Sequence, residues 1–128
     1  MANEPASPTI LYVEDQILIQ TMLADALKEA GFSLLVADDG SRAIQLLNAN
    51  RERVHGVITY IGLGSGPDGW VVARTAREIV AGIPVVYVSA VADQEWTSKG
   101  VPGSLMIAKP FVAAQIVVAI SSLMIVSE

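Results

Sequence analysis

Residues 10–15, with the sequence ILYVED, place a short apolar run directly before two carboxylates. Four further apolar runs follow along the chain: Ser33–Val36, Val57–Tyr60, Pro84–Val88 and Ser104–Ala108. Segments with helical patterning separate the five runs, an alternation typical of parallel strands joined by crossover helices. Because each run is continuously apolar rather than alternating, we expect both faces of the sheet to be covered. The pattern predicts a single doubly wound α/β domain.

The segments between these runs predict five helices. They are about Gln16–Ala30, a segment starting after Ser41, a segment starting near Trp70, about Asp93–Lys99, and a segment following Phe111. Asp15 is the expected N-cap of the first helix, and Gly31 lies just past its end. The fourth helix is short and has little apolar periodicity.

The last predicted helix is the most apolar of the five. Its main apolar stripe should face the sheet and consists of Ile116, Val117, Ile120, Leu123 and Met124. Ala114, Val118 and Ile125 fall outside that stripe. A helix with two apolar sides usually covers something on each side, which predicts a homodimer through this helix. The alternative is a helix that tolerates a few exposed aliphatic side chains.

The composition excludes several classes of protein. A chain of 128 residues, of which 52% are apolar and 16% charged, is long enough for one domain with its own core. The formal net charge of -5 and the scattering of only eight Lys and Arg residues argue against nucleic acid as a partner. The absence of cysteine excludes disulfides, thiolate catalysis and thiolate zinc sites.

Neither a secretory signal nor a membrane span is expected. Residues 1–8 hold no basic residue and no apolar run, so we expect a short disordered lead before a domain over residues 9–128. No stretch approaches the ~20 consecutive apolar residues of a membrane helix, and the uncharged segment Phe111–Val126 is too short for one. We therefore expect a cytoplasmic protein without a membrane partner.

Polar side chains accompany the ends of four predicted strands. Glu14 and Asp15 follow the first strand, Tyr60 ends the third, Ser89 follows the fourth and Lys109 follows the fifth. In a doubly wound sheet the ligand site lies beyond the carboxyl ends of the strands, so we expect these side chains to share one cleft. Paired carboxylates can hold Mg²⁺, while a hydroxyl and an ammonium group suit a phosphoryl group.

This pattern resembles the receiver domain of two-component response regulators, from Thr9 to about Met124. The matching segments are ILYVED (10–15), ADDG (37–40), PDG (67–69), VVYVSA (85–90) and AKPF (108–111). The resemblance implies a flavodoxin-like five-stranded parallel sheet in the order 2-1-3-4-5, with helices on both faces. It also implies that an aspartate at the end of strand three takes a phosphoryl group from a histidine kinase or a phosphotransfer protein, with Mg²⁺ bound beside it.

The resemblance implies a role for most residues of the predicted site. Glu14 and Asp15 match the metal-binding acid pair, and the backbone carbonyl of Gly62 matches a further metal ligand. Ser89 matches the hydroxyl that contacts the phosphoryl group, and Lys109 matches the ammonium group that does so.

Two positions depart from the family. The phosphoacceptor position is Tyr60, whose phenol has an ordinary pKa near 10 and cannot form an acyl phosphate. The missing carboxylate also predicts weaker Mg²⁺ binding. Met106 takes the position of an aromatic switch residue in many members, and a flexible thioether weakens a two-position switch. The proline that accompanies a cis peptide bond in the family is present, at Lys109–Pro110.

These features predict a receiver module that has lost aspartate phosphorylation. We expect it to act by binding to itself, to a histidine kinase or to another signalling protein, and not as an enzyme. An alternative is a phosphorelay receiver that uses Asp38, Asp39, Asp68 or the acid pair as acceptor. A more remote alternative is a phosphotransferase of the haloacid-dehalogenase type. That chemistry needs a second acid two residues later on strand one, where this chain has Gln16 and Ile17.

Overall fold

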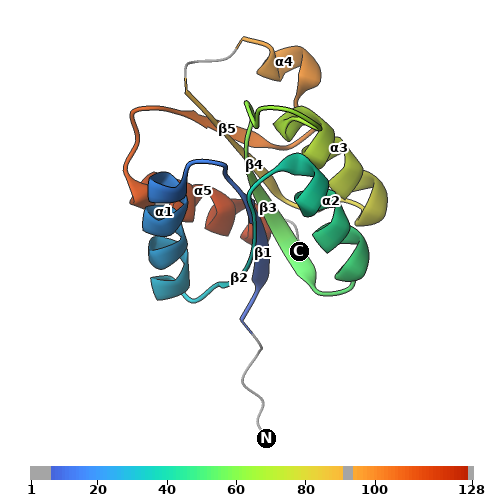
Figure 1. The fold of residues 1–128 in the computed structure, drawn as a ribbon. Coiled ribbons are helices and arrows are strands. Elements are labelled where there is room, and N and C mark those ends of the chain that lie inside the picture. The colour runs from blue at the N-terminus through green and yellow to red at the C-terminus, as the bar shows by residue number, and fades with distance from the viewer. Residues whose placement is uncertain (1–6, 91–93, 127–128) are drawn as a thin grey trace, which may run out of the picture.

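The computed structural model describes residues 7–90 and 94–126, which form a five-stranded parallel sheet between two layers of helices (Figure 1). The strands are β1 (Thr9–Val13), β2 (Ser33–Ala37), β3 (Val54–Tyr60), β4 (Val85–Ser89) and β5 (Leu105–Ala108). The helices are α1 (Ile17–Glu29), α2 (Gly40–Ala49), α3 (Gly69–Ile79), α4 (Trp96–Lys99) and α5 (Ala113–Val126). The strand order is β2-β1-β3-β4-β5, so the predicted α/β class and flavodoxin-like topology are confirmed.

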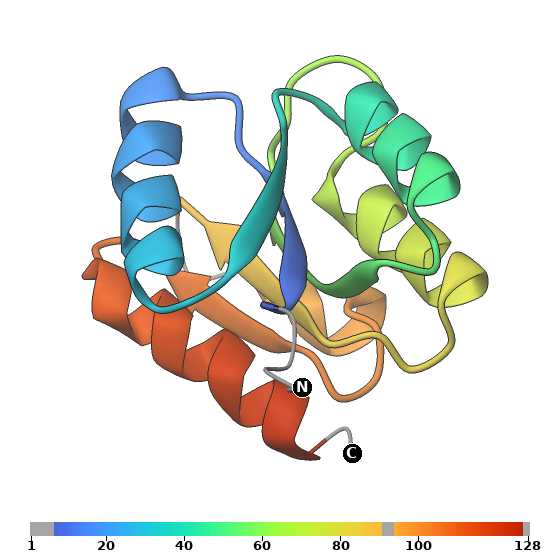
Figure 2. The same cartoon turned by 90° about the horizontal axis from the view of Figure 1, so that it is seen from below.

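The sheet separates two apolar cores. Helices α1 and α5 lie on one side of it, and α2 and α3 lie on the other (Figure 1 and Figure 2). Successive residues of a strand point to opposite sides. Ile10 therefore joins the core under α1 and α5, while Leu11 joins the core under α2 and α3. This double burial explains why the strands are apolar throughout rather than at every second residue.

The strand register brings the predicted site residues to one edge of the sheet. Val13 at the end of β1 pairs with Thr59 on β3. Ser89 at the end of β4 pairs with Ala108 on β5. Because the strands are parallel and end at matching levels, the residues that follow them leave the sheet at the same edge.

Helix α1 starts differently from the prediction. Its N-cap is Gln16, in an extended conformation and without a side-chain cap, so the prediction of Asp15 as N-cap is wrong. The backbone N–H of Gln16 instead donates to Oε2 of Glu14 at 3.1 Å, so the acid nearer the sheet binds the start of the helix. Gly31 follows the helix with a φ of 100°, the left-handed conformation expected just past a helix end.

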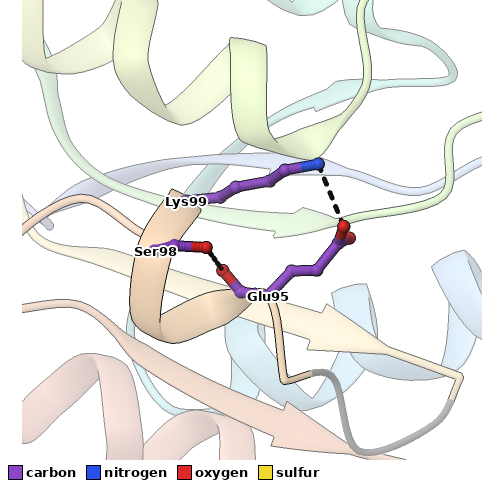
Figure 3. A network of polar contacts seen from close by, with 3 residues as sticks. All are labelled: Glu95, Ser98 and Lys99. Atoms are coloured by element: carbon purple, nitrogen blue, oxygen red, sulfur yellow. Dashed lines mark hydrogen bonds and ion pairs between the residues drawn. The ribbon is translucent and has the colours of Figure 1, made fainter.

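Helix α4 is a single turn of four residues with no buried side chain. The prediction extended it to Asp93, which lies outside the described residues. Figure 3 shows the polar contacts of this turn: Lys99 pairs with Glu95 at 3.2 Å, and the Ser98 hydroxyl donates to the Glu95 carbonyl oxygen at 3.2 Å. Trp96 is its one apolar contact with the core under α2 and α3, and a single apolar residue in one turn explains the weak periodicity.

Helix α5 presents two apolar sides. Ile116 and Ile120 are fully buried against the sheet, and Val117, Leu123 and Met124 are partly buried against the same core. Val118 and Ile125 are 65% and 73% exposed. The stripe predicted to face the sheet is therefore confirmed, and a second apolar side faces outward.

The predicted disordered lead covers residues 1–8, of which residues 1–6 lie outside the described part of the chain. Pro8 already contacts the sheet region, because its carbonyl oxygen accepts a hydrogen bond from the Ser33 N–H at 2.9 Å. Across residues 7–90 and 94–126, the structure contains no helix with the length and apolar character needed to cross a membrane.

Candidate functional site

The carboxyl edge of the sheet carries the side chains predicted for the site. Two backbone hydrogen bonds there join the residues that follow β3 and β5 to the end of β4. The Ile61 N–H donates to the Val88 carbonyl oxygen, and the Lys109 N–H donates to the Ser89 carbonyl oxygen, each at 2.9 Å. Tyr60 and Lys109 are therefore held on the two strands that flank β4.

The acid pair after β1 consists of one buried and one exposed carboxyl group. Glu14 is 1% exposed, and Asp15 is exposed. Burial raises the pKa of Glu14 most, and hydrogen bonding and charge from Asp15 raise it further, whereas the Gln16 N–H and the Lys109 ammonium lower it. Burial and Asp15 thus favour the neutral form of the Glu14 carboxyl group. The Gln16 N–H and the Lys109 ammonium favour its charged form.

Tyr60 and Lys109 form the contact at the centre of the site. The Lys109 Nζ lies over the Tyr60 ring, 5.2 Å from its centroid. Cation–π contacts of this kind contribute about 0.5–2 kcal/mol. Burial raises the pKa of the Tyr60 phenol, and the charges of Glu14 and Asp15 raise it further, so the ring is neutral at pH 7. A neutral ring therefore faces the ammonium group where the resemblance implies a carboxylate.

The remaining predicted residues surround this contact. Ser89 is buried at the end of β4. A Cβ atom placed on Gly62 would lie 3.8 Å from Cε2 of Tyr60, so the loop after β3 passes beside the ring. Met106 is half-buried and packs against the core under α2 and α3. The peptide bond between Lys109 and Pro110 is cis.

Gln20 is a site neighbour that the sequence analysis missed. Its side-chain Nε2 donates to the Glu14 carbonyl oxygen at 2.8 Å and to Oδ1 of Asp38 at 2.9 Å. The amide thus connects α1 to the ends of β1 and β2. A glutamine on the polar side of a helix has no pattern that distinguishes it from a solvated residue, so the sequence held no signal for this role.

Three of the carboxylates considered as alternative acceptors already have hydrogen-bond partners. Oδ1 of Asp39 accepts from the Arg42 N–H at 2.8 Å, and Oδ1 of Asp68 accepts from the Val71 N–H at 3.0 Å. Both acids are N-caps, of α2 and α3 respectively. Asp38 accepts from Gln20. These acids satisfy the ends of helices or join loops, which is a structural role.

The donors present suit a divalent cation only in part. Glu14 and Asp15 supply the carboxylate oxygens that Mg²⁺ prefers, and one or two carboxylates with several waters suffice in many sites. Within residues 7–90 and 94–126, no group of three or more His, Asp or Glu side chains is placed to hold a metal ion. The third acidic ligand that the resemblance implies is replaced by the neutral Tyr60 ring.

Comparison with known proteins identifies the family. The sequence matches the response regulator receiver domain over residues 10–121. The chain belongs to this family. A crystal structure of a response regulator receiver protein from Sinorhizobium medicae WSM419 is 39% identical to this receiver domain, with a TM-score of 0.91 over 95% of this chain and 98% of that chain.

More distant similarities agree with this family. A putative response regulator from Chloroflexus aurantiacus J-10-fl has a TM-score of 0.81 at 23% identity, over 93% of this chain and 98% of that chain, and shares the fold. YbdJ, an uncharacterized transcriptional regulatory protein of Bacillus subtilis (strain 168), is 29% identical over 103 residues, which are 80% of this chain and 44% of that protein. The receiver domain thus spans less than half the length of this curated relative.

Membership of the family defines the class of function. The chain is a receiver domain of two-component signalling. Receiver domains are generally signalling modules rather than enzymes; they typically bind Mg²⁺ at their acidic pocket and interact with histidine kinases and other signalling proteins.

Proposed function

We propose that this receiver domain does not accept a phosphoryl group at the end of β3 and that it signals by binding other proteins. The contact between the Lys109 ammonium and the neutral Tyr60 ring carries the proposal. An acyl phosphate forms only on a carboxylate, and the raised pKa of the phenol makes its oxygen a poorer nucleophile than a free tyrosine at pH 7.

The same replacement weakens the proposed metal site. Glu14, Asp15 and the Gly62 carbonyl are the proposed ligands, with one negative charge fewer than a site that includes an aspartate at position 60. Mg²⁺ is a hard cation that favours anionic oxygen, so its affinity should fall with that charge. Ser89 and Lys109 are the proposed contacts for a phosphoryl group, and they keep the chemistry to bind one without forming a bond to it.

The proposed partners follow from the family. A histidine kinase, another signalling protein, or a second copy of the chain through α5 would bind the domain in the cytoplasm. The proposed domain covers residues 9–128. Loss of the acceptor leaves binding as its role, so we propose no enzymatic activity and no contact with nucleic acid or membrane.

Intact mass after incubation with a small phosphodonor and Mg²⁺ tests the proposal. The wild-type protein should gain no phosphoryl mass. Tyr60→Asp should gain one phosphoryl group, because it restores a carboxylate beside Lys109 and the acid pair. Tyr60→Asn is the matched control, since it also removes the ring but supplies no nucleophile, and it should gain none.

Peptide mapping distinguishes the remaining outcomes. A wild-type protein that gains a phosphoryl group on Asp38, Asp39, Asp68 or the acid pair would be a phosphorelay receiver with a displaced acceptor, and would overturn the proposal. Failure of Tyr60→Asp to gain mass would show that position 60 alone does not account for the loss. Circular dichroism confirms that each variant is folded before it is compared.

A further inference from the structure

The amino edge of the sheet, where the chain enters β1 (Figure 1), is held by a side chain outside the receiver site. The backbone N–H of Thr9 donates to Nδ1 of His55 at 3.0 Å. His55 is the one histidine of the chain, and it is exposed to solvent. The start of β1 is thus joined to β3 by a group that can gain a proton.

A β-bulge brings the His55 ring to this position. Thr9 pairs with Val54 and Ile10 pairs with Gly56, so His55 is an extra residue on β3. A Cβ atom on Gly56 would lie 2.9 Å from Cδ1 of Ile10, so β3 approaches the core closely at this point. Bulges of this kind change the direction in which a side chain points.

The peptide group between Pro8 and Thr9 explains the direction of the hydrogen bond. Its carbonyl oxygen accepts from the Ser33 N–H of β2 at 2.9 Å. The N–H of the same peptide group points the opposite way, toward β3. In a regular parallel ladder this N–H would meet a backbone carbonyl, whereas here it meets the His55 ring. The ring therefore takes the place of one ladder partner.

This hydrogen bond exists only while the His55 ring is neutral. An Nδ1 atom that accepts a hydrogen bond carries no proton, so the ring proton is on Nε2. In the imidazolium both nitrogens are donors, and Nδ1 can no longer accept. Histidine is the side chain whose charge ordinarily changes between about pH 5 and 8. Uptake of one proton therefore removes the acceptor of the Thr9 N–H.

The surrounding charges do not compensate for this loss. In residues 7–90 and 94–126, the Thr9 N–H is the only hydrogen-bond partner of the His55 ring, and the ring has no ion pair. Residues 7–9, 80–84 and 110–126 carry no charge. The charged residues at the ends of the other elements that reach this edge are Lys28 and Glu29 of α1, Arg51, Glu52 and Arg53 before β3, and Arg77 and Glu78 of α3. Four cations and three carboxylates do not favour a further positive charge.

We infer that His55 is a pH-sensitive latch on the amino end of β1: the neutral ring holds Thr9 against β3, and the protonated ring releases Thr9 together with residues 7 and 8. The release is local, because Ile10 and Leu11 are fully buried and stay in the sheet. Glu14 follows the other end of β1, so the latch and the candidate functional site lie at opposite edges of the sheet. The inference does not rest on the proposed function.

Nitrogen NMR of the His55 ring tests the state of the latch. With one histidine in the chain, long-range ¹H–¹⁵N spectra report on this ring alone. At about pH 8 they should show a proton on Nε2 and none on Nδ1. A proton on Nδ1 at this pH would overturn the inference, because the Thr9 N–H would then have no acceptor.

Hydrogen exchange of the Thr9 amide tests the release. After correction for the intrinsic effect of pH, its exchange should accelerate about fivefold or more from about pH 8 to pH 5, as expected for the loss of one hydrogen bond. The Ser33 amide, which donates to Pro8, should accelerate with the same midpoint. The Leu11 amide, in the buried part of β1, is the internal control and should keep its protection.

Two variants separate the latch from other effects of pH. His55→Asn places an amide oxygen near the position of Nδ1, so it should hold Thr9 at every pH. His55→Gln is the matched control, since its oxygen reaches the position of Nε2 instead, and it should leave Thr9 released at every pH. Both replace an exposed side chain, and circular dichroism checks that each variant is folded.

Two results of the exchange measurement would overturn the inference. One is wild-type Thr9 exchange that does not change between about pH 8 and pH 5. The other is a pH response of Thr9 that persists in His55→Asn, which would assign the response to a different group. Neither result affects the phosphodonor measurement, which tests the proposed function independently.

Discussion

Tyr60 places a neutral ring beside the acid pair at the end of β3. A carboxylate at this position would add a third negative charge beside Glu14 and Asp15, and such a cluster is stable only with a cation among its members. The neutral ring removes that repulsion and offers its face to Lys109. We therefore expect the site to bind a metal ion more weakly than a site with a third acid. The Lys109 ammonium has the Tyr60 ring as a partner.

A double-mutant cycle measures the Tyr60–Lys109 contact. Tyr60→Leu and Lys109→Met each remove one partner, and their coupling in the free energy of unfolding should be about 0.5–1 kcal/mol. Chemical denaturation of the two single variants and the double variant gives this coupling. Pairing Tyr60→Leu with Lys28→Met, on the exposed side of α1, provides the control and should give additive effects. Additivity in the main cycle would contradict the contact.

Glu14 should make the stability of the domain depend on pH. Its raised folded-state pKa means that the native state holds the proton more tightly than the unfolded chain. The resulting stabilisation is fully present below the unfolded pKa near 4.5 and is lost as pH rises through the higher folded value. At neutral pH the native state therefore lacks this stabilisation, because burial disfavours the charged form of the Glu14 carboxyl group.

Glu14→Gln should remove this effect of burial while keeping an oxygen that accepts from the Gln16 N–H. We expect the Tm at pH 7 to rise by a few degrees, since about 1 kcal/mol corresponds to roughly 4 °C for a domain of this size. The gain should shrink as the pH approaches 4. Thermal melts across this pH range measure it, with Asp25→Asn, an exposed carboxylate of α1, as the control. A lower Tm for Glu14→Gln at pH 7 would refute the expectation.

At the scale of elements, the sequence predicted the strands, which are buried on both faces of the sheet. It missed features that depend on individual hydrogen bonds between polar side chains and the backbone. All five strands were predicted because apolar runs such as Val57–Tyr60 are buried on both faces. The start of α1 was predicted to within one residue, but its N-cap was not. The Gln16 N–H donates to the Glu14 carboxylate, and the Asp15 side chain does not cap the helix. The role of Gln20 was invisible for the same reason.

The start of α3 depends on a glycine that touches the end of β3. A Cβ atom on Gly69 would clash with the Tyr60 carbonyl oxygen and with Cα of Ile61. Gly69→Ala should therefore destabilise the domain by about 1–3 kcal/mol. Gly62→Ala is the matched control in the same loop, because its Cβ atom would meet only the edge of the Tyr60 ring at 3.8 Å. Equal losses in urea denaturation of both variants would contradict this reading of the loop.

At the scale of the whole molecule, the proposed function would separate the receiver fold from phosphorylation at the end of β3. The sheet order and the positions of Glu14, Ser89 and Lys109 follow from strands whose apolar pattern is intact, so the sequence sufficed to place them at one edge. The contact between the Lys109 ammonium and the Tyr60 ring could not be predicted from the sequence. Several rotamers of the long lysine side chain are compatible with the same apolar pattern of the strands. The receiver architecture is therefore compatible with a tyrosine at the end of β3.

The effect of Mg²⁺ on the thermal stability of the whole domain tests the proposed weakening of the metal site. A ligand that binds only the folded state raises the free energy of unfolding, by about 2.7 kcal/mol at 100 times its Kd. Millimolar Mg²⁺ should therefore raise the Tm of Tyr60→Asp by several degrees and leave the wild-type Tm nearly unchanged. Tyr60→Asn separates removal of the ring from gain of charge and should behave like the wild type. A wild-type shift equal to that of Tyr60→Asp would mean that Glu14 and Asp15 hold the ion without a third acid.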